Sequence, residues 1–447
     1  MRSPDASRES RWLGAAALGA LATLVGTGAA IPAQQSSALP PIRAITRRIA
    51  VAADTFGNVS GVRQLSDGRL IVNDVGKRRL VILDSTLAHA TVIADSTTGT
   101  QRAYGGTQGG IIPYRADSTI FVDPIAMSLL VVDPHGAIVR TFAAPRPADA
   151  PALSMPIGGA GLDAAGRLVY RNVRATCAPS FGCGFAIVAT KQDTAAIRAS
   201  PLPAWAWHDS VAIIRGTIAT QTIDTLGFIA TPFVANANVT RNPDGSVTIT
   251  REAQNPIPIA DGWTVVADGS VAFVRGLDYH IDWVNADGSR TSTPKIAHDW
   301  QRLTDSAKVW ILDSVKHVSD SVNQANAARQ AKQDSLSRAA GSPVNRTAIV
   351  VTWPDPADFP DYRPPITSYA TIKGDADDNV WIQQGGTPSS PLGPGSPLLF
   401  DVVNRQGVLI DRVQLPPSLS LAGFGPGVVY LTSREGSGIV LLKYRIR

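Results

Sequence analysis

The sequence predicts an all-β fold, a six-bladed β-propeller with one helical insertion. The first observation is a recurring unit, clearest from Ser66 to Asp84, made of a turn, a short β-rich run, a polar break and a second β-rich run. One such unit cannot bury its own apolar face, so repetition implies a ring or stack. The second observation is spacing: the first run returns after about 50 residues, the length of a four-stranded blade, or after twice that. These runs begin at Leu70, Ile120, Leu168, Val271, Val380 and Val429.

Residues 1–33 have the features of a secretory signal peptide. Three arginines precede Leu13–Val25, an apolar run too short to cross a membrane, and small residues at Gly28–Ala30 or at 31–33 offer a cleavage site. No other stretch approaches the roughly 18 apolar residues of a transmembrane helix. We therefore expect an exported chain, secreted or periplasmic, with residues 42–447 forming a single propeller domain.

The segment Ile42–Ala52 is β-rich and precedes the first repeat, while the last repeat is short of strands at its C-terminal end. Open sheet edges invite aggregation, so a ring needs closure. We expect this segment to pair into the last blade and to tie the two termini together.

The first blade is the clearest. Asp67-Gly68 is a two-residue turn signal, since glycine accepts positive φ and aspartate can bond to its own backbone. Leu70-Ile71-Val72 then reads as a strand, and Arg79–Asp84 supplies the next one.

The long interval after Leu168 leaves the number of blades open. Val211–Ile229 fits the outer two strands of the third blade, displaced by a loop over 172–208, which gives six blades; taken as the start of another blade, it gives seven. Cys177 and Cys183 lie in this loop. In an exported chain we expect them to form a disulfide, with two free buried thiols as the alternative. A zinc site would need further ligands, and no histidine lies near in sequence.

An insertion is expected at about 297–365. Apolar residues at three- and four-residue steps from Trp300 to Val322 predict an amphipathic helix that starts after Asp299 or Thr304. The continuation over 323–338 keeps helix-forming residues but loses the apolar stripe, so we expect an exposed helix end or partial disorder. Gly341-Ser342-Pro343 ends it.

A loop rich in proline and aromatic residues follows the helix. Its aromatic residues Trp353, Phe359 and Tyr362 are candidate contacts for a partner. In one interpretation the helix and loop cap a propeller face or a blade edge and bury Trp310 and Trp353. In the other they form a lid over the central channel that helps to build a ligand site.

Polar side chains end the anchor runs. If these runs are the innermost strands, their ends converge at one mouth of the ring. Arginines at this level oppose the binding of a cation by the aspartates, so we expect no metal and no other cofactor. Two arginines that face Asp and Gln suit a carboxylate or a polar polymer; alternatively, these groups satisfy one another and trapped water. The candidate ligand-binding residues are Asp74, Asp123, Arg171, Asn172, Arg275 and Gln383.

The first blade, Asp67–Asp74 followed by Arg79–Asp84, resembles NHL-type and related six-bladed propellers. The chain beyond the signal peptide resembles exported bacterial six-bladed propeller proteins with no assigned activity. The resemblance implies the architecture over most of 42–447 but not the chemistry. Relatives of this fold include protein-binding scaffolds, carbohydrate-linked modules, lactone hydrolases and a lyase class.

Composition and motifs narrow the function only in part. A formal net charge of +5, without a run of Lys or Arg, does not point to nucleic acid. Nucleophile-elbow, zinc-helix and phosphate-loop motifs are absent from the sequence. The first hypothesis is a monomeric, non-enzymatic scaffold that binds a protein, peptide or glycan on one ring face. The second is a propeller hydrolase or lyase with its site at the channel mouth.

Overall fold

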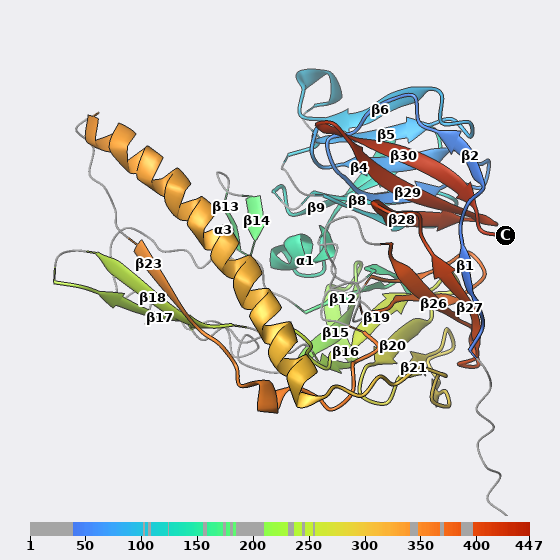
Figure 1. The fold of residues 1–447 in the computed structure, drawn as a ribbon. Coiled ribbons are helices and arrows are strands. Elements are labelled where there is room, and N and C mark those ends of the chain that lie inside the picture. Colours follow the sequence, from blue (N-terminus) through green and yellow to red (C-terminus); the bar gives the residue numbers. More distant parts are fainter. Residues whose placement is uncertain are drawn as a thin grey trace, which may run out of the picture. The chain divides into compact units, whose positions relative to one another are not determined.

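Six sheets repeat along the chain in the computed structural model, five with four strands and one with five (Figure 1). The fold is therefore a six-bladed β-propeller, as predicted, and Val211–Ile229 belongs to the third blade. The structure describes residues 39–101, 103–105, 109–123, 125–154, 159–172, 176–178, 182–184, 210–230, 237–243, 246–253, 255–339, 347–366, 371–385 and 397–447. The predicted signal peptide lies outside these ranges.

The strands of each blade pair in antiparallel order with their neighbours along the chain. Blade one contains β3 (Val59–Gln64), β4 (Leu70–Asp74), β5 (Arg79–Leu83) and β6 (Ala90–Asp95). Blade two contains β7 (Gly110–Pro113), β8 (Thr119–Asp123), β9 (Ser128–Val132) and β10 (Ile138–Ala143). Blade three contains β11 (Gly161–Leu162), β12 (Leu168–Arg171), β15 (Ser210–Thr217) and β16 (Thr222–Ala230).

The second half of the ring follows the same plan. Blade four contains β19 (Gly262–Val265), β20 (Val271–Arg275), β21 (His280–Val284) and β22 (Arg290–Ser292). Blade five contains β24 (Ile372–Gly374), β25 (Val380–Gln383), β26 (Leu399–Val403) and β27 (Leu409–Gln414), and blade six contains β28 (Leu419–Gly425), β29 (Val428–Glu435) and β30 (Gly438–Arg445). An apolar cluster lies between each pair of neighbouring blades.

Neighbouring blades meet through their first strands. β3 contacts β28 and β7, β11 contacts β7 and β19, and β19 contacts β24. A glycine at these crossings leaves room for a side chain of the neighbouring strand: a Cβ on Gly262 would lie 2.0 Å from Cδ1 of Ile372, and one on Gly423 would lie 2.7 Å from Cγ2 of Val62. The strands β3, β7, β11, β19, β24 and β28 are therefore the inner strands of the ring.

This corrects one expectation from the sequence. The anchor runs that start at Leu70, Ile120, Leu168, Val271, Val380 and Val429 are the second strands of their blades, not the innermost ones. The anchor runs are apolar on both faces because they are sandwiched between two blades, whereas every inner strand contains at least one glycine. A search for β-rich runs therefore finds the second strand first.

The N-terminal segment closes the ring, as predicted, and also reaches a second blade. β2 (Arg48–Val51) pairs antiparallel with β30 as the outermost strand of blade six. β1 (Ile42–Ala44) pairs in parallel with β27 and adds a fifth strand to blade five. Ile45, between them, is buried in the cluster of these two blades.

The insertion has two parts, which flank blade four in sequence. After it come the helix α3 (Asp305–Ala339), β23 (Thr347–Thr352) and the 3-10 turn η4 (Pro356–Asp358); before it come β17 (Ala237–Arg241) and β18 (Val247–Glu252). Strands β17, β18 and β23 form a separate sheet in which β18 and β23 run parallel. Short elements elsewhere are η1 (Thr98–Thr100), η2 (Pro147–Asp149), α1 (Ala150–Ser154), β13 (Thr176–Ala178) and β14 (Gly182–Gly184).

Of the two predicted helix starts, Thr304 is right, because its Oγ1 accepts a hydrogen bond from the Ala307 N–H at 3.2 Å. The helix is continuous to Ala339, so the segment 323–338 is the exposed helix end rather than a disordered one. The predicted stop at 341–343 lies outside the described residues.

Candidate functional site

Two of the candidate ligand-binding residues are carboxylates that hold turns. Asp74, at the end of β4, is buried; its Oδ1 accepts hydrogen bonds from the Gly57 and Asn58 N–H groups at 2.9 and 3.0 Å, and its Oδ2 pairs with Arg79 Nε at 3.1 Å. Asp123, at the end of β8, accepts hydrogen bonds from two backbone N–H groups, those of Gly105 and Ile125, at 3.2 and 3.0 Å. Both carboxylates therefore tie a strand end to a neighbouring turn.

The remaining strand-end residues make similar local bonds. Asn172 accepts a hydrogen bond from Arg146 at 2.7 Å, and Gln383 Oε1 accepts one from the Thr371 N–H at 3.0 Å. Arg171 ends β12 and is half-buried. The described contacts place each of these residues within its own blade or the adjoining loop, and their role in binding a ligand stays a prediction.

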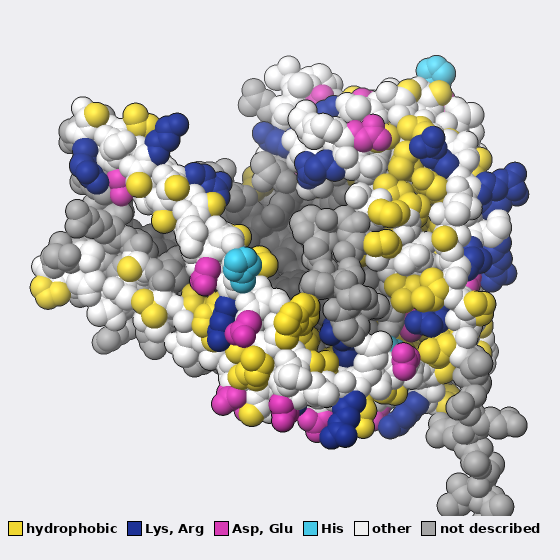
Figure 2. All heavy atoms as spheres, in the orientation of Figure 1, with side chains coloured by type: hydrophobic (Ala, Val, Ile, Leu, Met, Phe, Trp, Pro, Cys, Tyr) yellow, Lys and Arg dark blue, Asp and Glu magenta, His cyan; other side chains and the backbone are white. Residues whose placement is uncertain are grey.

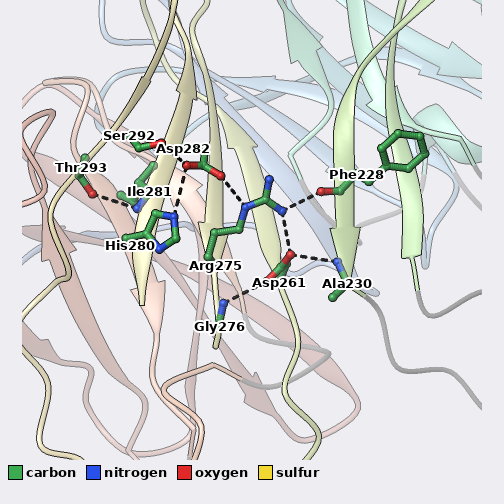
Figure 3. Close-up of polar contacts among 10 residues, drawn as sticks. All are labelled: Phe228, Ala230, Asp261, Arg275, Gly276, His280, Ile281, Asp282, Ser292 and Thr293. Carbon is green, nitrogen blue, oxygen red and sulfur yellow. Dashed lines mark hydrogen bonds and ion pairs between the residues drawn. The ribbon is translucent and has the colours of Figure 1, made fainter. Parts of the chain in front are cut away.

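Arg275 is the candidate around which polar groups do gather (Figure 3). It ends β20, where its Nε donates to Asp282 Oδ2 at 2.8 Å and its Nη1 donates to Asp261 Oδ2 and to the Phe228 carbonyl at 2.8 and 2.7 Å. Asp282 Oδ1 also accepts from Ser292 Oγ at 2.5 Å. His280 Nε2 lies 3.3 Å from that same oxygen. Sequence reasoning found Arg275 alone, because its partners come from β21, from the loop before β19 and from β16 of blade three.

A polar groove of about 270 Å³ lies beside this cluster. Arg275, Asp282, Arg290 and Ser292 line it together with Gly227 of blade three. Burial opposes ionisation of Asp282, but the hydrogen bonds from Ser292 and Arg275 hold its pKa below the ordinary value. The pKa of Arg275 is raised despite burial, because two carboxylates contact it. The groove thus presents ionised groups of both signs.

A second polar cluster is buried between blades four and five. Tyr279 OH donates to Asp401 Oδ2 at 2.8 Å and accepts a hydrogen bond from Gln384 Nε2 at 2.9 Å. Arg412 Nε lies 3.5 Å from the other oxygen of Asp401. Burial raises the pKa of Asp401 to about 6, even though Tyr279 and Arg412 favour the ionised form. Sequence reasoning missed this cluster, because its members are far apart in the chain.

The helix α3 carries an exposed row of apolar side chains. Only its first turns are packed: among its described residues the buried ones are Lys308 and Leu312. Every residue from 321 to 333 is exposed. Figure 2 shows hydrophobic side chains spaced along this helix on the surface. We call Ile311, Val315, Val318 and Val322 the α3 row. Ile311 packs against the buried cluster at the base of the helix and Val315 is half-buried, whereas Val318 is 62% exposed and Val322 is 52% exposed.

The base of α3 is fixed to the aromatic loop. Leu312 and Phe359 belong to one buried cluster, and Lys308 Nζ donates to the Phe359 carbonyl at 2.9 Å and pairs with Asp361 at 3.0 Å. Phe359 is 3% exposed, so it anchors the loop and cannot offer its ring to a partner. Of the three predicted aromatic contacts, Trp353 is partly buried against the same cluster and Tyr362 is 48% exposed.

The expectation that Trp310 is buried was wrong, since it is 51% exposed. The helix packs through Lys308 and Leu312, and this face turns Trp310 outward.

The two cysteines lie opposite each other in the hairpin β13–β14. Cys177 and Cys183 are direct partners in its antiparallel register. Residues directly opposite in such a pair have Cα atoms about 4.5–5.5 Å apart, within the range that a disulfide spans. The backbone is thus compatible with the predicted disulfide, which stays a prediction.

The described residues contain neither a metal-binding cluster nor a membrane-spanning helix. Within them, no group of three or more His, Cys, Asp and Glu side chains is placed to hold a metal ion. No helix in the described ranges has both the length and the apolar content needed to cross a membrane.

Comparison with known proteins finds distant likenesses. No protein-family model and no curated protein matches the chain. Among solved structures, virginiamycin B lyase from Staphylococcus aureus is 11% identical with a TM-score of 0.36, over 89% of this chain and 98% of that one. A calcium-binding regucalcin from Agrobacterium tumefaciens is 12% identical with a TM-score of 0.37, over 92% and 98%. A putative gluconolactonase is 13% identical with a TM-score of 0.35, over 92% and 95%. We take neither family nor activity from likenesses of this size.

Proposed function

We propose that this chain is an exported β-propeller scaffold that binds a protein partner along the α3 row. The observation that carries the proposal is the exposure of Val318 and Val322, both above 50%, on a helix whose base is rigidly packed. Scattered exposed apolar residues are ordinary, but a row at helical spacing on an otherwise bare helix is a typical recognition surface.

The energetics of α3 support the same proposal. Isolated helices are marginal in water, and most helical stability in proteins comes from packing an apolar face. From 321 to 333 every residue is exposed, so this stretch gains little from the described part of the chain. A partner helix that contacts Val318 and Val322 would supply packing where this exposed stretch begins.

The spacing of the row indicates the kind of partner. Ile311, Val315, Val318 and Val322 follow four-three-four steps, which is the a/d seam of a coiled coil. Among protein, peptide and glycan, such a seam favours a helical protein segment, because it offers no hydrogen-bonding groups to a sugar. The ring serves to hold the base of the helix in place.

The test places a photo-crosslinking amino acid on the helix in the natural host. At Val322, we expect one defined crosslinked product, and Val318→Asp in the same chain should abolish it. The matched control is the same probe at Ala327, which is exposed on the opposite face of α3. Equal products from both positions, or none at Val322, would contradict the proposal.

A further inference from the structure

Lys373 is a charged residue on one of the inner strands of the ring. It lies in β24, the inner strand of blade five, directly opposite Trp381 in the register of β24 and β25. Its ammonium donates to the carbonyl of Ala422 in β28, the inner strand of blade six, at 2.9 Å. The side chain is half-buried, so part of it remains open to solvent. Lys373 therefore sits at the crossing of blades five and six, close to the axis of the ring.

A second lysine shows what a buried ammonium normally receives in this chain. Lys308, at the base of α3, has both a carbonyl partner in Phe359 and a carboxylate partner, Asp361, at 3.0 Å. Lys373 has a carbonyl alone: within the described residues, no carboxylate lies within 4.0 Å of its ammonium. A carboxylate thus compensates the charge of the buried Lys308, whereas the charge of the half-buried Lys373 has no such partner among the described residues.

The charge of the inner strands has one sign. Their sequences contain Arg63 and Lys373 and no aspartate or glutamate. Arg63 pairs with Asp117 of blade two at 3.3 Å, so its charge is balanced. The charge of Lys373 is the one left over in the inner strands.

Partial withdrawal of an ammonium from water without a counter-charge is unfavourable. Burial lowers the pKa of Lys373 to about 8, and no neighbouring charge raises it again. The group stays mostly protonated at pH 7 and has two N–H donors beyond the one directed at Ala422. A perturbed group without a structural counter-charge is a candidate for binding.

We infer that Lys373 is the anchor of a binding site for a small carboxylate at the crossing of the inner strands of blades five and six. A carboxylate brings one negative charge, which matches the single uncompensated ammonium. A phosphate dianion would leave one charge unbalanced beside apolar Trp381 and Ala422. The site is independent of the α3 row, and neither requires the other.

The test measures the midpoint of thermal unfolding at pH 7 against sodium acetate, with sodium chloride keeping the ionic strength constant. We expect a saturable rise with acetate for the unmodified chain, because a ligand that binds only the folded state stabilises it. Lys373→Met should weaken the apparent acetate affinity at least about tenfold, as expected for a lost charge-assisted hydrogen bond. Phosphate at the same ionic strength should give a smaller rise than acetate.

Lys443→Met is the matched control. Lys443 also donates to a single carbonyl, that of Ser85, but it lies on β30, away from the inner strands. This variant should keep the full response to acetate. The inference is overturned if acetate gives no rise, if Lys373→Met and the unmodified chain respond alike, or if phosphate outperforms acetate. Without acetate, Lys373→Met should unfold at an unchanged or higher temperature. That result would show that the variant is folded and that Lys373 is not needed for the stability of the chain.

Discussion

At the residue scale, Asp401 shows how a propeller buries a charge between blades. It is 2% exposed. Its Oδ2 accepts a hydrogen bond from Tyr279 OH, and Arg412 Nε lies 3.5 Å from its Oδ1. Burial outweighs these contacts and raises its pKa to about 6 from an ordinary value of 3.8. The folded state therefore binds a proton more tightly than the unfolded chain does. The resulting stabilisation is complete below about pH 4 and is lost as the pH rises through 6.

Asp401→Asn should remove this loss, because the amide keeps an oxygen for Tyr279 and does not ionise. The free energy of unfolding of the unmodified chain should fall by about 1–3 kcal/mol between pH 4.5 and 7.5 from this group. In the variant that part of the fall should vanish, which urea denaturation at the two pH values measures. Asp278→Asn, at an exposed ion pair with Lys295, is the control and should leave the pH dependence unchanged. An unaltered slope in Asp401→Asn would contradict the assignment.

Single residues were the hardest level to predict from the sequence. Asp74 and Asp123 were recognised as polar strand ends, but their bonds to turn N–H groups follow from loop geometry that no local pattern encodes. Arg275 was recognised, yet its partner Asp261 lies in the loop before β19 and its partner Asp282 lies on β21, and the sequence did not show that these residues meet. The strands that carry the predicted site residues were also misassigned as innermost, whereas each is the second strand of its blade.

At the scale of elements, the short N-terminal segment contributes to the stability of the core as well as to ring closure. Ile45 links β1 and β2, is 2% exposed and packs with Trp381 and Leu415 in the cluster between blades five and six. Ile49, four residues on, is 46% exposed.

Ile45→Ala should destabilise the chain by about 2–4 kcal/mol, because it opens a cavity where the two blades meet. Ile49→Ala should change the free energy of unfolding by no more than about 0.5 kcal/mol. Equilibrium denaturation in urea compares the two variants. Similar losses for both would mean that the segment adds edge pairing without joining the core.

Elements with a strong period were predicted well, and irregular ones were not. The strands around Leu70 and Ile120 follow a repeat, and the helix from Asp305 follows a three- and four-residue step, so both could be located. β17 and β18 were missed, because they belong to no repeat and find their third strand, β23, only after blade four and α3 have intervened. The apolar stripe of α3 was found, but the assumption that it faces the core was wrong for Trp310.

At the scale of the whole molecule, the number of blades could be predicted because the repeat length matches one blade, and the closure because a ring must pair its last edge. The partner surface could not, because nothing in the sequence tells an apolar stripe that meets the core from one that meets another protein.

Export has a direct test on the whole chain. Protein recovered from the natural host should begin after the small residues at 28–33, and its two cysteines should be joined. Intact-mass measurement before and after reduction and alkylation reports both outcomes: loss of the leader, and thiols that react only after reduction. A full-length chain with both thiols reactive from the start would contradict export and the disulfide together.

The pairing of β2 with β30 has a consequence for the order of events during synthesis. Arg48 lies opposite Tyr444, so a strand that precedes the first blade finds its partner only in the last strand of the sixth blade. Contacts of such large sequence separation form late and slowly. Blades one to five can assemble as the polypeptide emerges, but the circle stays open until β30 has been made. A truncated product that lacks β30 would keep an unpaired edge, so this architecture makes synthesis of β30 a condition for closing the ring.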